Sequence, residues 1–299
     1  MRHPGDPGLA LSLEPKRSWR TVKNGIMTAF MIAAFLTITI PLIAILYSLL
    51  SRGAAVAGND FPAFFTEAIP MVSRRPGPGM GPAILGTLLC TGGATLIAVP
   101  LGIMGAVYLH EYGRASKFAK VVRFMAMVMT GVPSIVMGLF VYVLWTMRFG
   151  YSAFGGALAL ACLMLPIVIG ATEQMLRLVP DHLREAAFAL GARKSRVILT
   201  VVLPAALPGI VSGCLLAVAR AAGETAPLLF TIGAATAFNP HLFTDANTAL
   251  SVQIFGNATS SFVAAQERAW GAALTLVALT FLLTVVARFV SARFAARRS

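Results

Sequence analysis

Six long stretches of this chain contain no Asp, Glu, Lys or Arg, and short polar segments separate them. Each stretch reaches the ~17 to 25 residues that a helix needs to cross a bilayer. A chain in lipid must satisfy its backbone hydrogen bonds within each span, and a helix does so. The pattern therefore predicts an all-α polytopic membrane protein with six transmembrane helices. The stretches are residues 24–51, 76–109, 124–147, 149–172, 197–219 and 269–287.

The first apolar stretch is predicted to be a retained anchor. It is longer than the apolar region of a signal peptide, and no small-residue cleavage site follows it. We therefore expect a tail over residues 1–24 and one membrane domain over residues 25–299, with its core at about 81–287. A seventh span over residues 225–244 is disfavoured, because Pro227 and Pro240 would leave backbone groups unpaired in lipid.

Composition and charge support a membrane protein and suggest its orientation. At 58% hydrophobic and 12% charged residues, a chain of 299 residues has too little polar surface to cover a water-soluble globule. Of the 24 Lys and Arg residues, 18 lie in the two tails and in residues 111–123 and 173–196. The positive-inside rule places these segments and both termini in the cytoplasm. This asymmetry accounts for the net charge of +13 without a nucleic-acid partner.

A short polar segment at residues 180–204 carries helix signals between two apolar stretches. We expect an amphipathic helix over residues 180–191, with Asp181 at its N-cap and Gly191 turning the chain through a positive φ. A second helix should begin near Ser195 and enter the membrane at Pro204. An ordinary amphipathic loop on the inner membrane surface is the alternative interpretation.

The spacing within this segment resembles the EAA loop of ABC importer permeases, where Glu-Ala-Ala, a Gly and a Leu-Pro pair stand at fixed offsets. Val201 is the one departure, since it replaces the usual Ile. The resemblance implies that the segment docks onto a separate ATP-hydrolysing subunit. The positions that it assigns to this coupling are Glu185, Ala186, Ala187, Gly191, Leu203 and Pro204.

Arg220 and Glu224 are opposite charges inside the fifth predicted span, four residues apart. A helix places such residues on one face within pairing reach. Charges inside a span cost about 2.5 to 3.5 kcal/mol each near the bilayer centre, so they are rarely without a role. We hypothesise that Arg220 exchanges its bond with Glu224 for an anion, because its forked guanidinium suits phosphate oxygens. A structural salt bridge between helices is the alternative.

The third predicted span contains an irregular place at Pro133, which has no amide to donate and disrupts the bond to the carbonyl of Met129. We expect a broken helix there. Ser134 and the amides after it could then present a half-helix N-terminus to an anion, as discontinuous transporter helices do. A proline kink without such a role is the alternative.

Three further runs resemble the A-type permease of phosphate-uptake ABC importers. They are GMGPAILGTLL at residues 79–89, GVPSIVMGLF at 131–140 and ARAAGETAPLLFT at 219–231. The resemblance covers most of residues 25–299 and implies the ABC type-1 permease fold, a bacterial inner-membrane location and phosphate as substrate. With it, the residues expected to line the substrate path are Arg220, Glu224, Thr225 and Ser134.

The same resemblance implies the partners. They are a sister permease, two ATP-binding subunits and an extracytoplasmic phosphate-binding protein. ATP and Mg would be bound by the ATP-binding subunits, so no cofactor is expected in this chain.

The sequence leaves three alternative functions to consider. Another oxyanion, such as sulfate or molybdate, remains the alternative substrate, and a passive anion channel would not need a coupling segment. An intramembrane enzyme is disfavoured, because Ser134 and Thr225 have no His or Lys at helical reach in the sequence. A zinc-protease motif begins at His110 and Glu111 but fails at Arg114, so no metal site is expected.

Overall fold

The computed structural model describes residues 19–72, 74, 77, 79–113 and 116–296, and every regular element among them is helical. The chain divides into two compact units, residues 1–48 and 49–299. The described part of the first unit is the beginning of α1 (Trp19–Asn59). Residues 19–24, predicted as tail, are thus already helical, whereas residues 1–18 of that tail lie outside the described residues.

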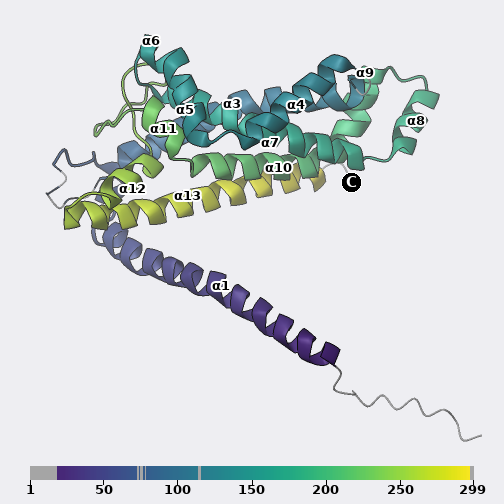
Figure 1. The fold of residues 1–299 in the computed structure, drawn as a ribbon. Coiled ribbons are helices and arrows are strands. Elements are labelled where there is room, and N and C mark those ends of the chain that lie inside the picture. Colours follow the sequence, from purple (N-terminus) through teal and green to yellow (C-terminus); the bar gives the residue numbers. More distant parts are fainter. Residues whose placement is uncertain (1–18, 73, 75–76, 78, 114–115, 297–299) are drawn as a thin grey trace, which may run out of the picture. The chain divides into compact units, whose positions relative to one another are not determined.

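The second unit is a bundle in which α7 (Ala153–Leu178) packs against α3 (Gly81–Val107) and α10 (Leu203–Ala222) (Figure 1). Short π-helical segments extend α3 and precede α10, namely η1 (Tyr108–Tyr112) and η3 (Ile198–Val202). The remaining helices are α2 (Ala63–Thr66), α4 (Lys117–Gly131), α5 (Ser134–Val141), α6 (Met147–Phe149), α8 (Asp181–Ala189), α9 (Lys194–Val197), α11 (Ala226–Thr231), α12 (Leu250–Ala258) and α13 (Val263–Ala296), with the π-helical η2 (Tyr142–Thr146) between α5 and α6.

The described residues contain five helices long and apolar enough to cross a membrane, and a sixth crossing if a bent helix pair counts as one span. That pair joins residues 117–131 to residues 134–149 and bends by 109°. It occupies the third predicted span, and its break falls at Val132 and Pro133, so the expected broken helix is confirmed. Residues 225–249, all described, hold only the six-residue α11, so the disfavoured seventh span is absent.

Small residues let the central helices approach closely. Ala94 and Ala98 of α3 and Ala161 of α7 are buried in the main core. A Cβ placed on Gly102 of α3 would lie 2.6 Å from Cγ1 of Val168 on α7, so only glycine fits there. Close backbone contact of this kind drives helix association where lipid removes the usual hydrophobic force. The packed α3–α7 pair thus forms a rigid support for the less regular elements around it.

Candidate functional site

A pocket of about 140 Å³ lies beside the break between α4 and α5. This is several times the ~10 to 15 Å³ that one water requires, so a small oxyanion fits. Side chains from four parts of the fold line it: Met129, Thr130, Val132, Ser134, Leu163, Pro166, Ile167, Arg220 and Glu224. Three of the four predicted path residues therefore meet around one space.

Arg220 and Glu224 form a loose ion pair in this pocket. Arg220 Nε lies 3.6 Å from Glu224 Oε1, which is beyond ordinary hydrogen-bond length. The expected pairing is confirmed, but the prediction that one continuous helix carries both residues is wrong, because α10 ends at Ala222. The turn that follows is held by Ser251 Oγ, which donates to the carbonyl of Glu224 at 3.0 Å. The backbone of Glu224 is thus held in place, and its side chain is 21% exposed, whereas the Arg220 side chain is 68% exposed.

Ser134 is the first residue of α5, directly after Pro133 at the helix break. The carbonyl of Pro133 accepts from the amides of Val136 and Met137, at 3.0 and 3.3 Å, so the helical bonds begin immediately after the break. The positive end of the α5 dipole is therefore at the pocket wall. Thr225 precedes α11 and is not among the residues that line this pocket. Its role stays a prediction.

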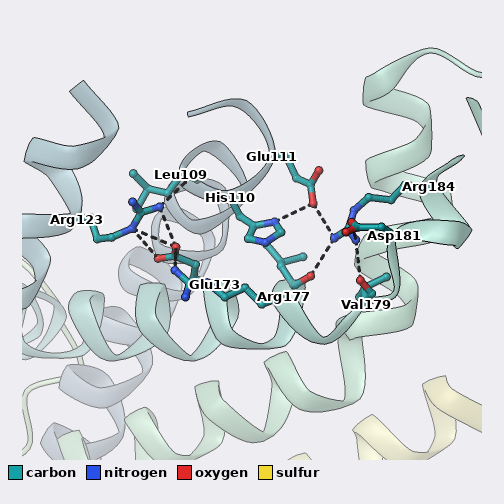
Figure 2. A network of polar contacts seen from close by, with 10 residues as sticks. Leu109, His110, Glu111, Arg123, Glu173, Arg177, Val179, Asp181 and Arg184 are labelled. Carbon is teal, nitrogen blue, oxygen red and sulfur yellow. Dashed lines mark hydrogen bonds and ion pairs between the residues drawn. The ribbon is translucent and has the colours of Figure 1, made fainter. Parts of the chain in front are cut away.

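A second cluster of charged residues was missed by the sequence analysis, although Glu173 and Arg177 have the i, i+4 spacing of a helical pair. Glu173 Oε1 accepts from Arg177 Nη2 at 2.8 Å and lies 2.9 Å from Arg123 Nη2 (Figure 2). Arg123 Nη2 also donates to the carbonyl of Leu109, at 3.3 Å. The cluster therefore joins α4, α7 and η1.

Arg184 of α8 is buried and binds two other elements of the fold (Figure 2). Its Nη1 donates to the carbonyl of Val179 at 2.7 Å, and its Nη2 donates to that of Leu176 at 2.9 Å and to Glu111 Oε1 at 3.1 Å. These bonds satisfy carbonyls at the end of α7, where a helix leaves its last acceptors unpaired. His110 Nδ1 lies 3.0 Å from the same oxygen of Glu111. One guanidinium thus fixes α8 to both α7 and η1.

The helix expected to couple to the ATPase, α8, lies at one end of the bundle beside α9, far from α11 and α12 (Figure 1). Its predicted N-cap is wrong: Pro180 occupies that position, and Asp181 is the first helical residue, paired with Arg184 at 3.0 Å. Gly191 has φ +77°, which confirms the expected turn. The next helix begins at Lys194, one residue before the expected start.

The apolar face of α8 points away from the bundle in part. Ala186 is exposed and Leu190 is 89% exposed, whereas Ala187 packs against the main core. Glu185 is exposed as well. At the start of α10, Leu203 also packs against that core, and the half-buried Pro204 occupies the first turn. The six predicted coupling residues therefore divide into an outward surface and the support behind it, and their role stays a prediction.

Replacing Arg184 with Ala is expected to release α8 from the bundle. Removing one partner of a buried ion pair costs about 3 to 5 kcal/mol, so amide exchange in α8 should accelerate by about 100-fold or more. Hydrogen exchange measured on the purified protein checks this, with the exposed Arg193→Ala as the control. Unchanged exchange in α8 would show that Arg184 does not hold the helix.

No three side chains of His, Cys, Asp or Glu in the described part of the chain come close enough to hold a metal ion. What the site offers is an anion-sized pocket with an exposed guanidinium, a less exposed carboxylate and a helix N-terminus.

Comparison with known proteins agrees with this architecture. Residues 98–299 match the family described as binding-protein-dependent transport system inner membrane component. The phosphate transport system permease protein PstA of Yersinia pestis is 43% identical over 292 residues, which cover 96% of each chain. PstA 1 of Mycobacterium tuberculosis (strain CDC 1551 / Oshkosh) is 42% identical over 282 residues, covering 93% of this chain and 91% of that protein.

Solved structures share the fold at low sequence identity. A chain of a bacterial alginate ABC transporter, in complex with its periplasmic protein, aligns with TM-score 0.61 and 14% identity, covering 94% of this chain and 99% of that one. A chain of the MetNI methionine ABC transporter aligns with TM-score 0.56 and 18% identity over 71% of this chain and 93% of that one. The expected all-α ABC type-1 permease fold is confirmed. The chain therefore belongs to the binding-protein-dependent transport system inner membrane components, and within them to the family of the PstA permeases.

Proposed function

We propose that this multi-pass inner-membrane protein is the permease subunit through which an ATP-driven importer moves inorganic phosphate into the cytoplasm. The observation that carries the proposal is the pocket where Arg220, Glu224 and Ser134 meet at a helix break. Relatives more than 40% identical over most of their length are phosphate transport permeases, which favours phosphate as the anion. The chain is a transport subunit, and ATP hydrolysis belongs to a partner.

The geometry of the ion pair suits transient binding. At 3.6 Å, Arg220 and Glu224 attract each other without a full hydrogen bond, so an entering phosphate competes with a weak contact. A guanidinium offers phosphate two parallel N–H bonds, which a carboxylate at this distance does not receive. While phosphate is bound, the Glu224 carboxylate stays nearby, because the backbone that carries it is held by Ser251, and it repels the anion. Glu224 therefore keeps the site from retaining the anion and favours its release.

The partners follow from the family and from α8. The family implies an importer complex with an ATPase and a binding protein. We infer that α8 faces the cytoplasm and inserts its outward surface into an ATP-binding subunit. The complete assembly would add a sister permease, a second ATP-binding subunit and an extracytoplasmic phosphate-binding protein. Arg184 then transmits movement of α8 to α7 and η1, because its three bonds to Leu176, Val179 and Glu111 leave α8 little freedom to move separately.

Another oxyanion is the alternative substrate. Phosphate at neutral pH carries a proton that it can donate, and Glu224 is a suitable acceptor in the pocket. Sulfate has no such proton, so its approach to Glu224 is only repulsive. A passive channel is disfavoured, because a channel does not need a helix such as α8 that binds an ATP-hydrolysing partner and is attached to α7 and η1.

Reconstitution tests the function. The importer, assembled with its partners in vesicles, should take up phosphate only when ATP is inside and the binding protein is outside. Excess sulfate should not reduce the rate. Uptake without ATP would indicate a channel, and suppression of phosphate uptake by sulfate would indicate a broader oxyanion permease.

A further inference from the structure

A second pocket continues from the first along the groove between α4 and α7. Its volume is about 340 Å³, and it shares Thr130 and Pro166 with the first pocket. The residues that line it are Arg123, Ala126, Met127, Thr130, Pro166, Ile169, Gly170, Glu173, Gln174 and Arg177. From Pro166 to Arg177 the groove follows eleven residues of α7, or roughly 16 Å at 1.5 Å per residue.

The groove leads away from Arg220 and toward the end of the bundle that carries α8. Arg177 stands in the last turn of α7, two residues before Val179, whose carbonyl accepts from Arg184. Arg123, Glu173 and Arg177, which line the second pocket, are therefore near the end of the bundle that carries α8 (Figure 2). With α8 in the cytoplasm, this pocket would lie on the cytoplasmic side of the first.

Charge distinguishes the two pockets. Arg220 and Glu224 cancel in the first, whereas Arg123 and Arg177 share one carboxylate in the second and leave a net charge of +1. The two arginines also differ in their exposure and in the number of bonds that they make to the protein. Arg123 binds Glu173 and the carbonyl of Leu109, and its side chain is 33% exposed. Arg177 is 61% exposed, and in the described part of the chain it bonds to protein through Nη2 alone.

A guanidinium carries five N–H donors, so most of those on Arg177 remain available to a ligand in the pocket. Gly170 adds to the space: a Cβ built there would meet no heavy atom within 4 Å. The pocket therefore combines room, a net positive charge and unused donors, which is what binding of a phosphate oxyanion requires.

We propose that Arg177, supported by Arg123 and Glu173, forms a second phosphate-binding station on the cytoplasmic side of the path. It receives the anion from Arg220 and releases it to water. The proposal rests on the proposed function. Glu173 lowers the affinity of this station, as Glu224 does for the first, because it neutralises one of the two arginines.

A purely structural role for the cluster makes a different prediction. Arg123 alone would hold α4 to α7 and η1, since it contacts both Glu173 and Leu109. Loss of Arg177 would then have little effect on phosphate uptake or on its inhibition, because the contacts of Arg123 with Glu173 and Leu109 remain. A station predicts instead that phosphate on the cytoplasmic side occupies Arg177 and slows import.

The test uses the complete importer in vesicles, with ATP inside, binding protein outside and inorganic phosphate preloaded in the lumen. In the wild type, lumenal phosphate should inhibit the initial uptake rate. Arg177→Gln removes a charge-assisted bond, so half-inhibition should need about tenfold more lumenal phosphate. Glu173→Gln should shift half-inhibition in the opposite direction, because the station gains net charge.

A third variant tests the connection between the pockets. Gly170→Leu should place a bulky side chain in the groove and lower the maximal uptake rate, because Gly170 lines the pocket and a Cβ there meets no heavy atom within 4 Å. Gly25→Leu makes the same change in α1, which does not line either pocket, and should leave the rate unchanged. Equal rates in the two variants would contradict a path through this groove.

The outcomes separate the two proposals. If wild-type vesicles take up no phosphate, the proposed function fails. If they transport normally and lumenal phosphate inhibits wild type, Arg177→Gln and Glu173→Gln equally, the station is wrong and the function stands. A phospholipid headgroup is another source of phosphate oxygens. If raising the fraction of anionic lipid abolishes the inhibition, the pocket holds lipid and the station is overturned.

Discussion

Arg220→Ala should reduce ATP-dependent phosphate uptake by about 100-fold or more, because a forked pair of charge-assisted bonds to the anion contributes roughly 3 kcal/mol or more. Insertion and assembly should be unaffected, since the side chain is 68% exposed and its contact with Glu224 is 3.6 Å long. Uptake of labelled phosphate in vesicles measures the effect, and co-purification of the partner subunits reports assembly.

Two further variants show whether charge or shape matters at this position. Arg220→Lys keeps the charge but loses the fork, so it should recover only part of the uptake. Glu224→Gln leaves Arg220 without a competitor, so phosphate should bind more tightly and leave more slowly, which lowers both KM and the maximal rate. Normal uptake by Arg220→Ala would refute a direct role in the path and leave the pair as a structural salt bridge.

The arrangement of spans could be predicted from the sequence because lipid imposes a length and a backbone requirement on every crossing. The break near Pro133 was equally predictable, since proline lacks the amide that a continuous helix needs there. The pairing of Arg220 with Glu224 was local enough to foresee. The end of α10 before Glu224 was missed, because Ala222 and Gly223 give only a weak signal for helix termination.

The two polar clusters in Figure 2 could not be predicted in this way. Arg123 and Glu173 are 50 residues apart, and Arg184 and Glu111 are 73 apart. Their meeting depends on how α3, α4 and α7 pack, and no local spacing encodes that. Counting charges assigned Glu173 to a cytoplasmic loop, whereas α7 continues through it to Leu178. The second pocket was missed for the same reason.

Replacing Ala186 with Trp should uncouple the permease from its ATP-binding subunit. Leu183 and Ala186 of α8 are exposed and three residues apart, and the exposed Leu190 caps the end of the helix, so the three form one shallow apolar surface. A partner groove that closes on an alanine cannot also hold an indole, since overfilling a packed contact costs ~1 to 3 kcal/mol or more. Phosphate-stimulated ATP hydrolysis and uptake should both fall by about tenfold or more, as measured in reconstituted vesicles.

Because Ala186 is exposed, the indole meets solvent rather than the bundle, and the variant itself should fold normally. Ala186→Ser is the matched control: it alters polarity with little added volume and should retain most of the stimulated hydrolysis.

Arg184→Ala tests how α8 is attached to the bundle. In that variant the ATP-binding subunit still binds α8, but the helix no longer moves with α7 and η1. That variant should keep the ATPase bound while losing uptake. If Ala186→Trp retained wild-type stimulation, α8 would not be the docking surface, and the importance of Arg184 would then be limited to folding.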